Sequence, residues 1–414
     1  MSVQDLTQLK TQVERAVAEA KITDIHTHLF TPAFGDLLLW GFDELVNYHY
    51  LVAETLRVAD ISYEKFWALS GEQRANLIWQ TLFIDNSPYS EACRGVLTVL
   101  DKLGLDVAGR DVTSYRKYFR SLTVQEYIDK AFAVAKIDSV VMTNDPFDAQ
   151  EHKVWMQGFE SDPRFKAALR LDPLLVFWEK SCGDLQNWGY DVDQALSARA
   201  LQEIRRFLAD WIKRMNPVYM AVSFPSSFRY PEESACARII EECVLPVSRE
   251  YNVPFALMIG VKRQVNPGLR LAGDGLGKAD IGAVEYLCAN YPDNKFLCTM
   301  LSRENQHELA VNARKFGNLL IFGCWWFLNN PSLIEEITRL RFELLGVSVI
   351  PQHSDARVLD QVIYKWAHSR EIIAKVLVDK YSDLARTGWQ VTEAEIQRDV
   401  AKLFGGNFWS FLEK

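Results

Sequence analysis

Short apolar runs alternate with amphipathic stretches along most of the chain. In the amphipathic stretches, apolar residues recur at spacings of three and four, which is typical of helices that pack by one face. The apolar runs are rich in β-branched and aromatic residues, which favours strands, and alternation of the two patterns predicts βα units in a parallel sheet. Eight strands are predicted, over 23–29, 139–145, 166–173, 218–224, 254–260, 295–301, 319–326 and 347–356.

Eight strands with helices between them predict the α/β class and a (β/α)8 TIM-type barrel, with an open doubly wound sheet as the alternative. The connection after the first strand is far longer than the others, and its periodic stretches are separated by Gly and Pro. We therefore expect a large helical insertion over about 31–122, covering the barrel mouth. Further helices are expected over about 356–414. The whole chain, 1–414, is expected to form a single domain, although its length also fits two or three.

Composition narrows the class of protein. The chain is 49% hydrophobic and 24% charged, which is typical of a globular protein with a large core. A formal net charge of −8 without a long basic block excludes nucleic acid as a partner, so an anionic ligand needs individually placed arginines. Residues 1–22 predict an amphipathic helix rather than a signal peptide, and no run of about 18 apolar residues predicts a membrane span. We expect a cytoplasmic protein and leave a homo-oligomer open.

Two histidines lie two residues apart at the end of the first predicted strand. In a strand such residues face the same side, so His26 and His28 can direct both imidazoles to one point. Two imidazoles at one point suit a divalent metal. The alternative is a pair of histidines satisfied by hydrogen bonds on a half-buried strand.

Asp355 follows the eighth predicted strand. Barrel closure would make that strand a neighbour of the first, so Asp355 would arrive beside His26 and His28 and complete a metal site. The alternative is that Asp355 caps the helix predicted after it. A site of two His and one Asp leaves positions open and suits Zn, Mn, Fe or Co, among which zinc is our first choice.

Five segments carry a resemblance that extends over nearly the whole chain: DIHTHLF (24–30), YHY (48–50), LRLDP (169–173), FGCWWF (322–327) and HSDAR (353–357). The paired histidines and the distant Asp resemble the amidohydrolase superfamily, and the five segments together resemble its uronate isomerases. The resemblance implies an aldose–ketose isomerase that converts D-glucuronate to D-fructuronate and D-galacturonate to D-tagaturonate. It also implies one divalent metal, on His26, His28 and Asp355.

The other predicted strand ends separate this branch from the hydrolases. Hydrolases of the superfamily commonly add a Lys after the fourth strand and His after the fifth and sixth. Here those ends read SFPSS, MIGVKR and MLSREN, which makes a two-metal centre unlike this chain. One alternative is a mononuclear metal-dependent hydrolase or decarboxylase acting on a small carboxylated substrate. Another is a sugar-acid binder without catalysis.

An aldose–ketose conversion needs a base for the C2 proton, stabilisation of the enediolate, and an acid/base pair that opens the sugar ring. The resemblance implies Asp355 for proton transfer. His49 and Tyr50 lie in the predicted insertion and are our candidates for ring opening, the alternative being that both only pack on a helix.

The substrate's carboxylate needs a fork of hydrogen-bond donors. Arg170, after the third strand, and Arg357, two residues past Asp355, are the candidates, and the alternative is an ion pair such as Arg170 with Asp172.

Trp325 and Trp326 are predicted to end the seventh strand and to face opposite ways, so that one can support the sugar's C–H face; the resemblance favours Trp326. It also leads us to expect an arginine near the C-terminus, where this chain has Lys414.

Overall fold

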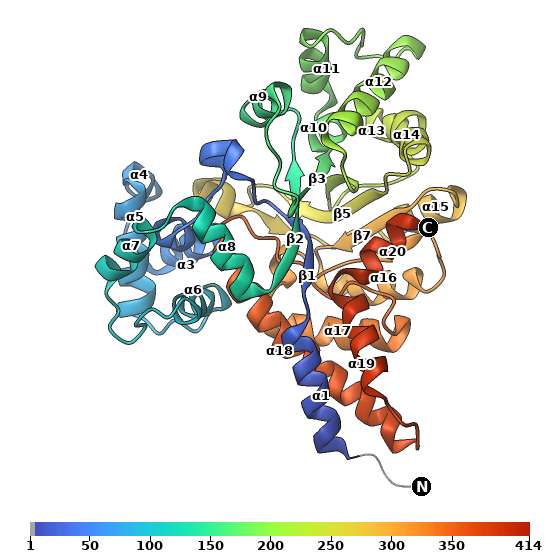
Figure 1. Cartoon of the computed structure of the whole chain (residues 1–414). Coiled ribbons are helices and arrows are strands. Elements are labelled where there is room, and N and C mark those ends of the chain that lie inside the picture. Colours follow the sequence, from blue (N-terminus) through green and yellow to red (C-terminus); the bar gives the residue numbers. More distant parts are fainter. Residues whose placement is uncertain (1–4) are drawn as a thin grey trace.

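The computed structural model describes residues 5–414, and its centre is a parallel sheet whose strands follow chain order (Figure 1). The order is β1-β2-β3-β4-β5-β7-β8, and every neighbouring pair is parallel. A short strand, β6 (Gly275–Leu276), pairs antiparallel with β5 off this path. Seven predicted strands are confirmed: β1 Ile22–Thr27, β2 Ile137–Asn144, β3 Phe165–Arg170, β4 Met220–Pro225, β5 Phe255–Lys262, β7 Phe296–Met300 and β8 Leu319–Ile321.

The strand predicted over 347–356 is wrong, because this segment makes only an isolated bridge between Phe322 and Ile350. Pro351 has no N–H to donate, and Asp355 has a φ of 52°, which turns the chain out of an extended course. The segment still links the two ends of the sheet. On one side the Gly323 N–H donates to the Ile350 carbonyl (2.8 Å), and on the other the Asp355 N–H donates to the His26 carbonyl (3.1 Å).

The segment between β1 and β2 is helical, as predicted, and lies on one side of the sheet (Figure 1). Several of its helices begin with an N-cap from Ser, Thr or Asp, and Ser70 and Thr123 form full capping boxes. The bounds are η1 Pro32–Leu37, α2 Phe42–Val46, α3 His49–Val58, α4 Tyr63–Ala68, α5 Gly71–Trp79, η2 Gln80–Ile84, α6 Glu91–Lys102, α7 Val112–Arg120 and α8 Val124–Ala135.

Helices also separate the later strands, as expected for βα units. The longest of them, α12, buries one apolar stripe that includes Phe207 and Trp211. Their bounds are α9 Ala149–Gln157, α10 Asp172–Val176, α11 Trp178–Asn187, α12 Ala198–Met215, α13 Ala235–Ile239, η3 Ile240–Val244, α14 Leu245–Glu250, η4 Pro267–Gly273, α15 Gly282–Asn290, η5 Arg303–Asn305, α16 Gln306–Ala313, η6 Trp326–Leu328 and α17 Pro331–Leu345.

The two chain ends pack together away from the insertion. The expected N-terminal helix is α1 (Leu6–Glu19), which packs on α18; residues 1–4 of that prediction lie outside the described part. No helix within residues 5–414 has the length and apolar character that crossing a membrane needs. The C-terminal elements are α18 Gln361–Arg386, α19 Glu393–Ala401, η7 Lys402–Gly406 and α20 Asn407–Glu413.

The inner face of the sheet has its own apolar cluster, to which every strand on the path contributes a residue and which α20 covers with Phe408 and Phe411. Because side chains alternate along a strand, the opposite face carries the larger cluster beneath the helices. The inner cluster therefore fixes what lies beneath the carboxyl ends of the strands. Its strand residues include Ile25, Val141, Ala168, Ala221, Ala256, Met258, Leu297 and Leu320.

Candidate functional site

His26, His28 and Asp355 meet at the carboxyl end of β1. The Asp355 Oδ1 atom lies 3.4 Å from His28 Nε2 and 3.7 Å from His26 Nε2. One donor atom from each residue lies within 4.8 Å of the other two, so all three could bind one metal ion. Asp355 does not act as the expected alternative, a helix cap, because α18 begins at Gln361 with Asp360 in the cap position.

The electrostatics of these three residues suit a cation. Burial lowers the pKa of His26 to about 3 and that of His28 well below its ordinary value, so both imidazoles are neutral and can ligate at neutral pH. The buried Asp355 Oδ1 atom has no hydrogen-bond partner among the described residues. A buried carboxylate oxygen without a donor is costly unless a cation meets it. The donor set therefore fits a divalent metal.

Buried polar groups behind Asp355 hold the segment that carries it. Asp24 accepts from the Ser354 N–H (3.0 Å) and the Trp366 indole N–H (2.8 Å). The Lys365 ammonium donates to the Ser354 carbonyl (2.6 Å). Burial raises the pKa of Asp24 to about 6 and lowers that of Lys365 to about 8. These contacts fix the backbone before Asp355, whose left-handed conformation carries strain of about 1–3 kcal/mol.

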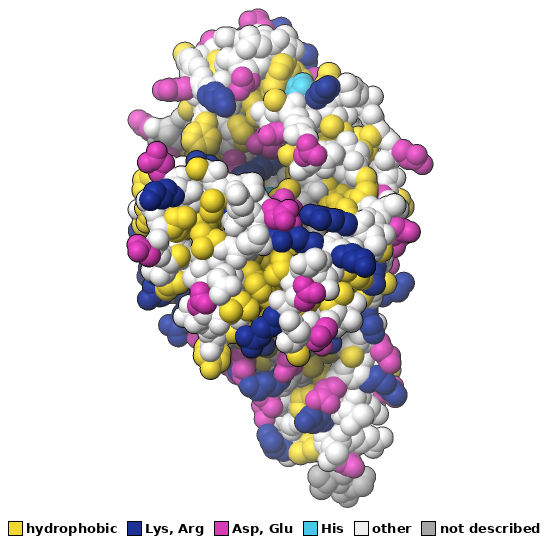
Figure 2. Space-filling view, turned by 90° about the vertical axis from the view of Figure 1, so that its left-hand side faces the viewer, with side chains coloured by type: hydrophobic (Ala, Val, Ile, Leu, Met, Phe, Trp, Pro, Cys, Tyr) yellow, Lys and Arg dark blue, Asp and Glu magenta, His cyan; other side chains and the backbone are white. Residues whose placement is uncertain are grey.

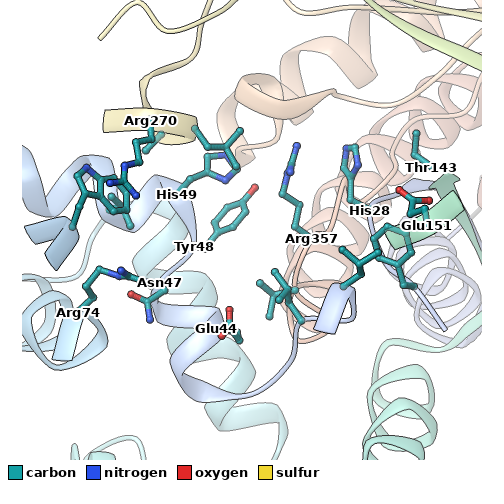
Figure 3. Close-up of a pocket in the computed structure, with 18 of the residues that line it drawn as sticks. His28, Glu44, Asn47, Tyr48, His49, Arg74, Thr143, Glu151, Arg270 and Arg357 are labelled. Carbon is teal, nitrogen blue, oxygen red and sulfur yellow. The ribbon is translucent and has the colours of Figure 1, made fainter. Parts of the chain in front are cut away.

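A cavity of about 450 Å³ opens above His28. Figure 2 shows a hollow on the side of the molecule that carries the insertion, with basic side chains inside it. Figure 3 shows the cavity itself: Tyr48 and His49 face Arg357 and His28 across it, and Glu151 lies beside His28. The insertion and the strand ends thus contribute opposite walls.

His49 and Tyr50 begin α3, and both are near the site as predicted. His49 lines the cavity, and burial lowers its pKa well below its ordinary value, so it is neutral. The Tyr50 ring lies 4.7 Å from that of His49 and stacks on Phe327. The His49 Nε2 and Tyr50 hydroxyl groups are buried and have no hydrogen-bond partner within residues 5–414. Both therefore pack on α3, as the alternative held, and also keep polar atoms free.

Arg170 and Arg357 both line the cavity, but their surroundings differ. Arg170 forms the ion pair with Asp172 that we considered as an alternative, with Nη2 to Oδ1 at 2.9 Å. Burial acts to lower the pKa of Arg170, but the carboxylates of Asp172 and Asp145 outweigh it and raise that pKa. The Arg357 guanidinium has no acidic partner within 4.0 Å in the described chain. Arg357 is therefore the less compensated charge.

The strand assignment of Trp325 and Trp326 is wrong. β8 ends at Ile321, and Trp326 begins η6 with a φ of 50°, so strand alternation does not set their directions. Both side chains are buried in the inner cluster, and neither lines the cavity. Trp326 supports the site from behind: its ring meets that of His49 at 6.2 Å, edge to face, and its indole N–H has no partner in the described residues.

Glu151 is a cavity residue that sequence reasoning missed. One carboxylate oxygen accepts from the Asn144 side chain and from the Asp145 N–H, both at 3.0 Å. Burial raises the pKa of Glu151 to about 8, so it carries a proton near neutral pH and can donate into the cavity. Its sequence signal was hidden, since an acid in the first turn of α9 reads as an ordinary helix start.

Two other residues lie where the sequence did not place them. His353, which we expected to be a surface or structural residue, is fully buried with its ring 5.3 Å from that of His26. Lys414 lies over the Phe411 ring at 5.7 Å and does not line the cavity.

Comparisons with solved structures place this geometry among known proteins. A uronate isomerase from Bacillus halodurans C-125 is 57% identical, with a TM-score of 0.98 over 100% of this chain and 98% of that one. A uronate isomerase from Thermotoga maritima (15% identical, TM-score 0.79, 100% of both chains) shares the fold. So does a glucuronate isomerase from Caulobacter crescentus (14%, 0.76, 100% of this chain and 95% of that one). No family model matches the chain, and the curated proteins hold no match.

Proposed function

This chain belongs to the uronate isomerase family, and on that premise we propose that it interconverts D-glucuronate with D-fructuronate and D-galacturonate with D-tagaturonate. It is an isomerase. In such a reaction a proton leaves C2, an enediolate forms, and a proton returns at C1 while C2 becomes the ketone. The site must therefore hold an open-chain sugar acid, accept a proton and return it.

One observation carries the proposal: unpartnered acid/base groups and two arginines converge on one cavity. His49 Nε2, the Tyr50 hydroxyl and Asp355 Oδ1 are buried polar atoms without partners in the described chain. Native proteins rarely leave such atoms unsatisfied, so their concentration here indicates a polar ligand.

The substrate's carboxylate is proposed to bind Arg357, with Arg170 beside it. A guanidinium offers two parallel donors to a carboxylate, and Arg357 has no competing acid within 4.0 Å among residues 5–414. Arg170 shares its charge with Asp172 and is expected to orient the substrate more than to neutralise it.

His26, His28 and Asp355 would hold one divalent metal, for which zinc is our first choice ahead of manganese, iron and cobalt. When bound, such an ion supplies positive charge that stabilises negative charge developing on the substrate's C1 and C2 oxygens. The neutral imidazoles leave that charge uncompensated by cations of their own.

We propose that Asp355 moves the proton between C2 and C1. It is the carboxylate at the meeting point of β1 and the 350–356 segment, and Lys365 and Asp24 hold its backbone in place. His49 is proposed to open the sugar ring, since it is neutral and its free nitrogen faces the cavity. Tyr50 assists with its hydroxyl, and Trp326 supports His49 from behind.

The fold fits the same proposal. We interpret the sheet as a (β/α)8 barrel in which 350–356 takes the eighth position, the insertion covers the mouth, and the whole chain is one domain. The hydrogen bonds from Ile350 to Gly323 and from Asp355 to His26 support closure.

Proton exchange tests the proposed function. Protein loaded with zinc is incubated with D-glucuronate or D-galacturonate in D2O, and NMR follows the C2 proton and the ketose signals. We expect deuterium at C2 together with ketose formation, and neither with Asp355→Asn. If neither sugar acid changes while an ester or lactone of a small carboxylated compound is cleaved, the hydrolase alternative replaces this proposal.

A further inference from the structure

Tyr219 lies just before β4 and points into the inner cluster, beneath the metal-ligand candidates. It is 1% exposed, and its ring meets that of Phe408 edge to face at 6.2 Å. Neither the sequence motifs nor the roles proposed above include this tyrosine. Its hydroxyl is nevertheless the group that contacts the far side of the His26 ring.

Two hydrogen bonds define the hydroxyl's environment. The Tyr219 oxygen lies 2.8 Å from the Ile25 carbonyl oxygen and 3.0 Å from His26 Nδ1. A carbonyl only accepts, so the single hydroxyl hydrogen is committed to Ile25. The hydroxyl oxygen must then accept from His26, which places the imidazole proton on Nδ1.

The opposite arrangement is unfavourable. If the hydroxyl donated to Nδ1, its oxygen lone pairs would face the Ile25 carbonyl at 2.8 Å with no proton between them. The His26 proton would then lie on Nε2 and point toward Asp355. A protonated nitrogen has no lone pair for a metal.

The local course of β1 explains why a hydroxyl is needed here. The pairing of β1 with β2 is irregular between Asp24 and Thr27, so Ile25 and His26 lie in a break of the ladder. Tyr219 gives the Ile25 carbonyl a donor that the sheet does not supply. By contrast, the structure gives His28 no ring hydrogen bond among the described residues, so its tautomer has no such restraint.

We propose that Tyr219 is a positioning residue that holds His26 in the Nδ1–H tautomer and so keeps its Nε2 lone pair aimed at Asp355 and the proposed metal. Partners of this kind set both the tautomer and the ring direction of ligating histidines, and losing one typically costs about 10–100-fold in metal affinity. The inference rests on the metal site of the proposed function, although the tautomer itself is a property of the metal-free protein.

The experiment reads the tautomer directly. Metal-free protein labelled with ¹⁵N-histidine is studied by long-range ¹H–¹⁵N correlation, and a His26→Gln variant identifies the His26 signals. We expect Nδ1–H in the parent and a mixture or Nε2–H in Tyr219→Phe. Zinc affinity, measured by competition with a chromophoric chelator, should weaken by ~10–100-fold in Tyr219→Phe.

Tyr115→Phe is the matched control. Its hydroxyl also donates to a backbone carbonyl, that of Asp106 at 2.7 Å, but it lies in the insertion away from the metal ligands. We expect this variant to keep the parent's His26 tautomer and zinc affinity, so that a general loss of packing is separated from the effect on His26.

Each outcome decides the inference. An Nε2–H tautomer in the parent overturns it, even if Tyr219→Phe fails to fold, and so does an unchanged zinc affinity in folded Tyr219→Phe. A protein that shows the Nδ1–H tautomer and the affinity loss but isomerises neither sugar acid keeps this inference and refutes the proposed function instead.

Discussion

Arg170 and Arg357 should separate into a residue that stabilises the fold and one that binds substrate. Both line the same cavity, yet only Arg170 has an acidic partner within 4.0 Å among residues 5–414. Replacement of each by Met removes the charge and keeps much of the side-chain volume. The two variants should therefore fail in different ways.

Arg170→Met should mainly destabilise the protein. Asp172 is 6% exposed and would keep only a long bond from the Ser223 N–H, at 3.3 Å. Breaking a buried ion pair by removing one partner costs about 3–5 kcal/mol, and we expect about 2–4 kcal/mol here because the arginine side chain is itself 24% exposed. Thermal unfolding followed by circular dichroism should show a clear fall in the midpoint.

Arg357→Met should leave stability nearly unchanged and lower kcat/KM for sugar acids. Losing a hydrogen-bonded partner of a buried carboxylate costs about 2–5 kcal/mol, which corresponds to a fall of ~30- to ~5000-fold at ~1.4 kcal/mol per tenfold. Turnover of a neutral aldose, which has no carboxylate, should change little. Arg303→Met is the control, since Arg303 is exposed and pairs with Glu336.

The reasoning fails if Arg357→Met destabilises the protein as much as Arg170→Met does. It fails equally if Arg357→Met keeps kcat/KM for both sugar acids within about threefold of the parent, a difference below ~0.7 kcal/mol.

Three further outcomes are expected. Asp355→Asn should fold normally, since Asn tolerates the φ of 52°, but should lose metal in elemental analysis and at least ~100-fold in kcat, as general acid–base groups typically contribute. Chelation should abolish activity and lower the thermal midpoint, and zinc at ~1000 times its Kd should restore about 4 kcal/mol; an unchanged midpoint and rate would contradict the metal site. The pKa of Glu151 is raised from 4.5 to about 8 by burial, so the folded state holds a proton that the unfolded state releases, and stability falls as pH rises from about 4.5 to 8. Glu151→Gln should flatten that fall, by at most about 5 kcal/mol, and parallel unfolding profiles for parent and variant would refute the buried proton.

Local pattern was enough for the strand positions and for much of the metal-ligand set. Period-two alternation put His26 and His28 on one side of β1, and seven strands lie within a few residues of their predicted places. The helical character of the insertion also followed from local periodicity and capping residues. Such signals are contained within a few consecutive residues, so the sequence alone carries them.

The eighth strand and the tryptophan pair show where local pattern misled. The run 347–356 has strand-like composition, but Pro351 and the left-handed Asp355 prevent a regular ladder. The FGCWWF run continues past β8 into a turn, so alternation no longer determines which indole faces the cavity. In both cases a backbone departure of one or two residues outweighed propensity.

By itself, the sequence determined which residues share a strand face and which helices cap and cover the sheet. Only the tertiary structure decided that Asp172 compensates Arg170, that Glu151 enters the cavity protonated, and that Tyr219 reaches His26. The reason is physical: a pKa or a hydrogen-bond partner depends on distance and burial between segments that are far apart in the chain. Those are fixed when the elements pack, and no short window of residues contains them.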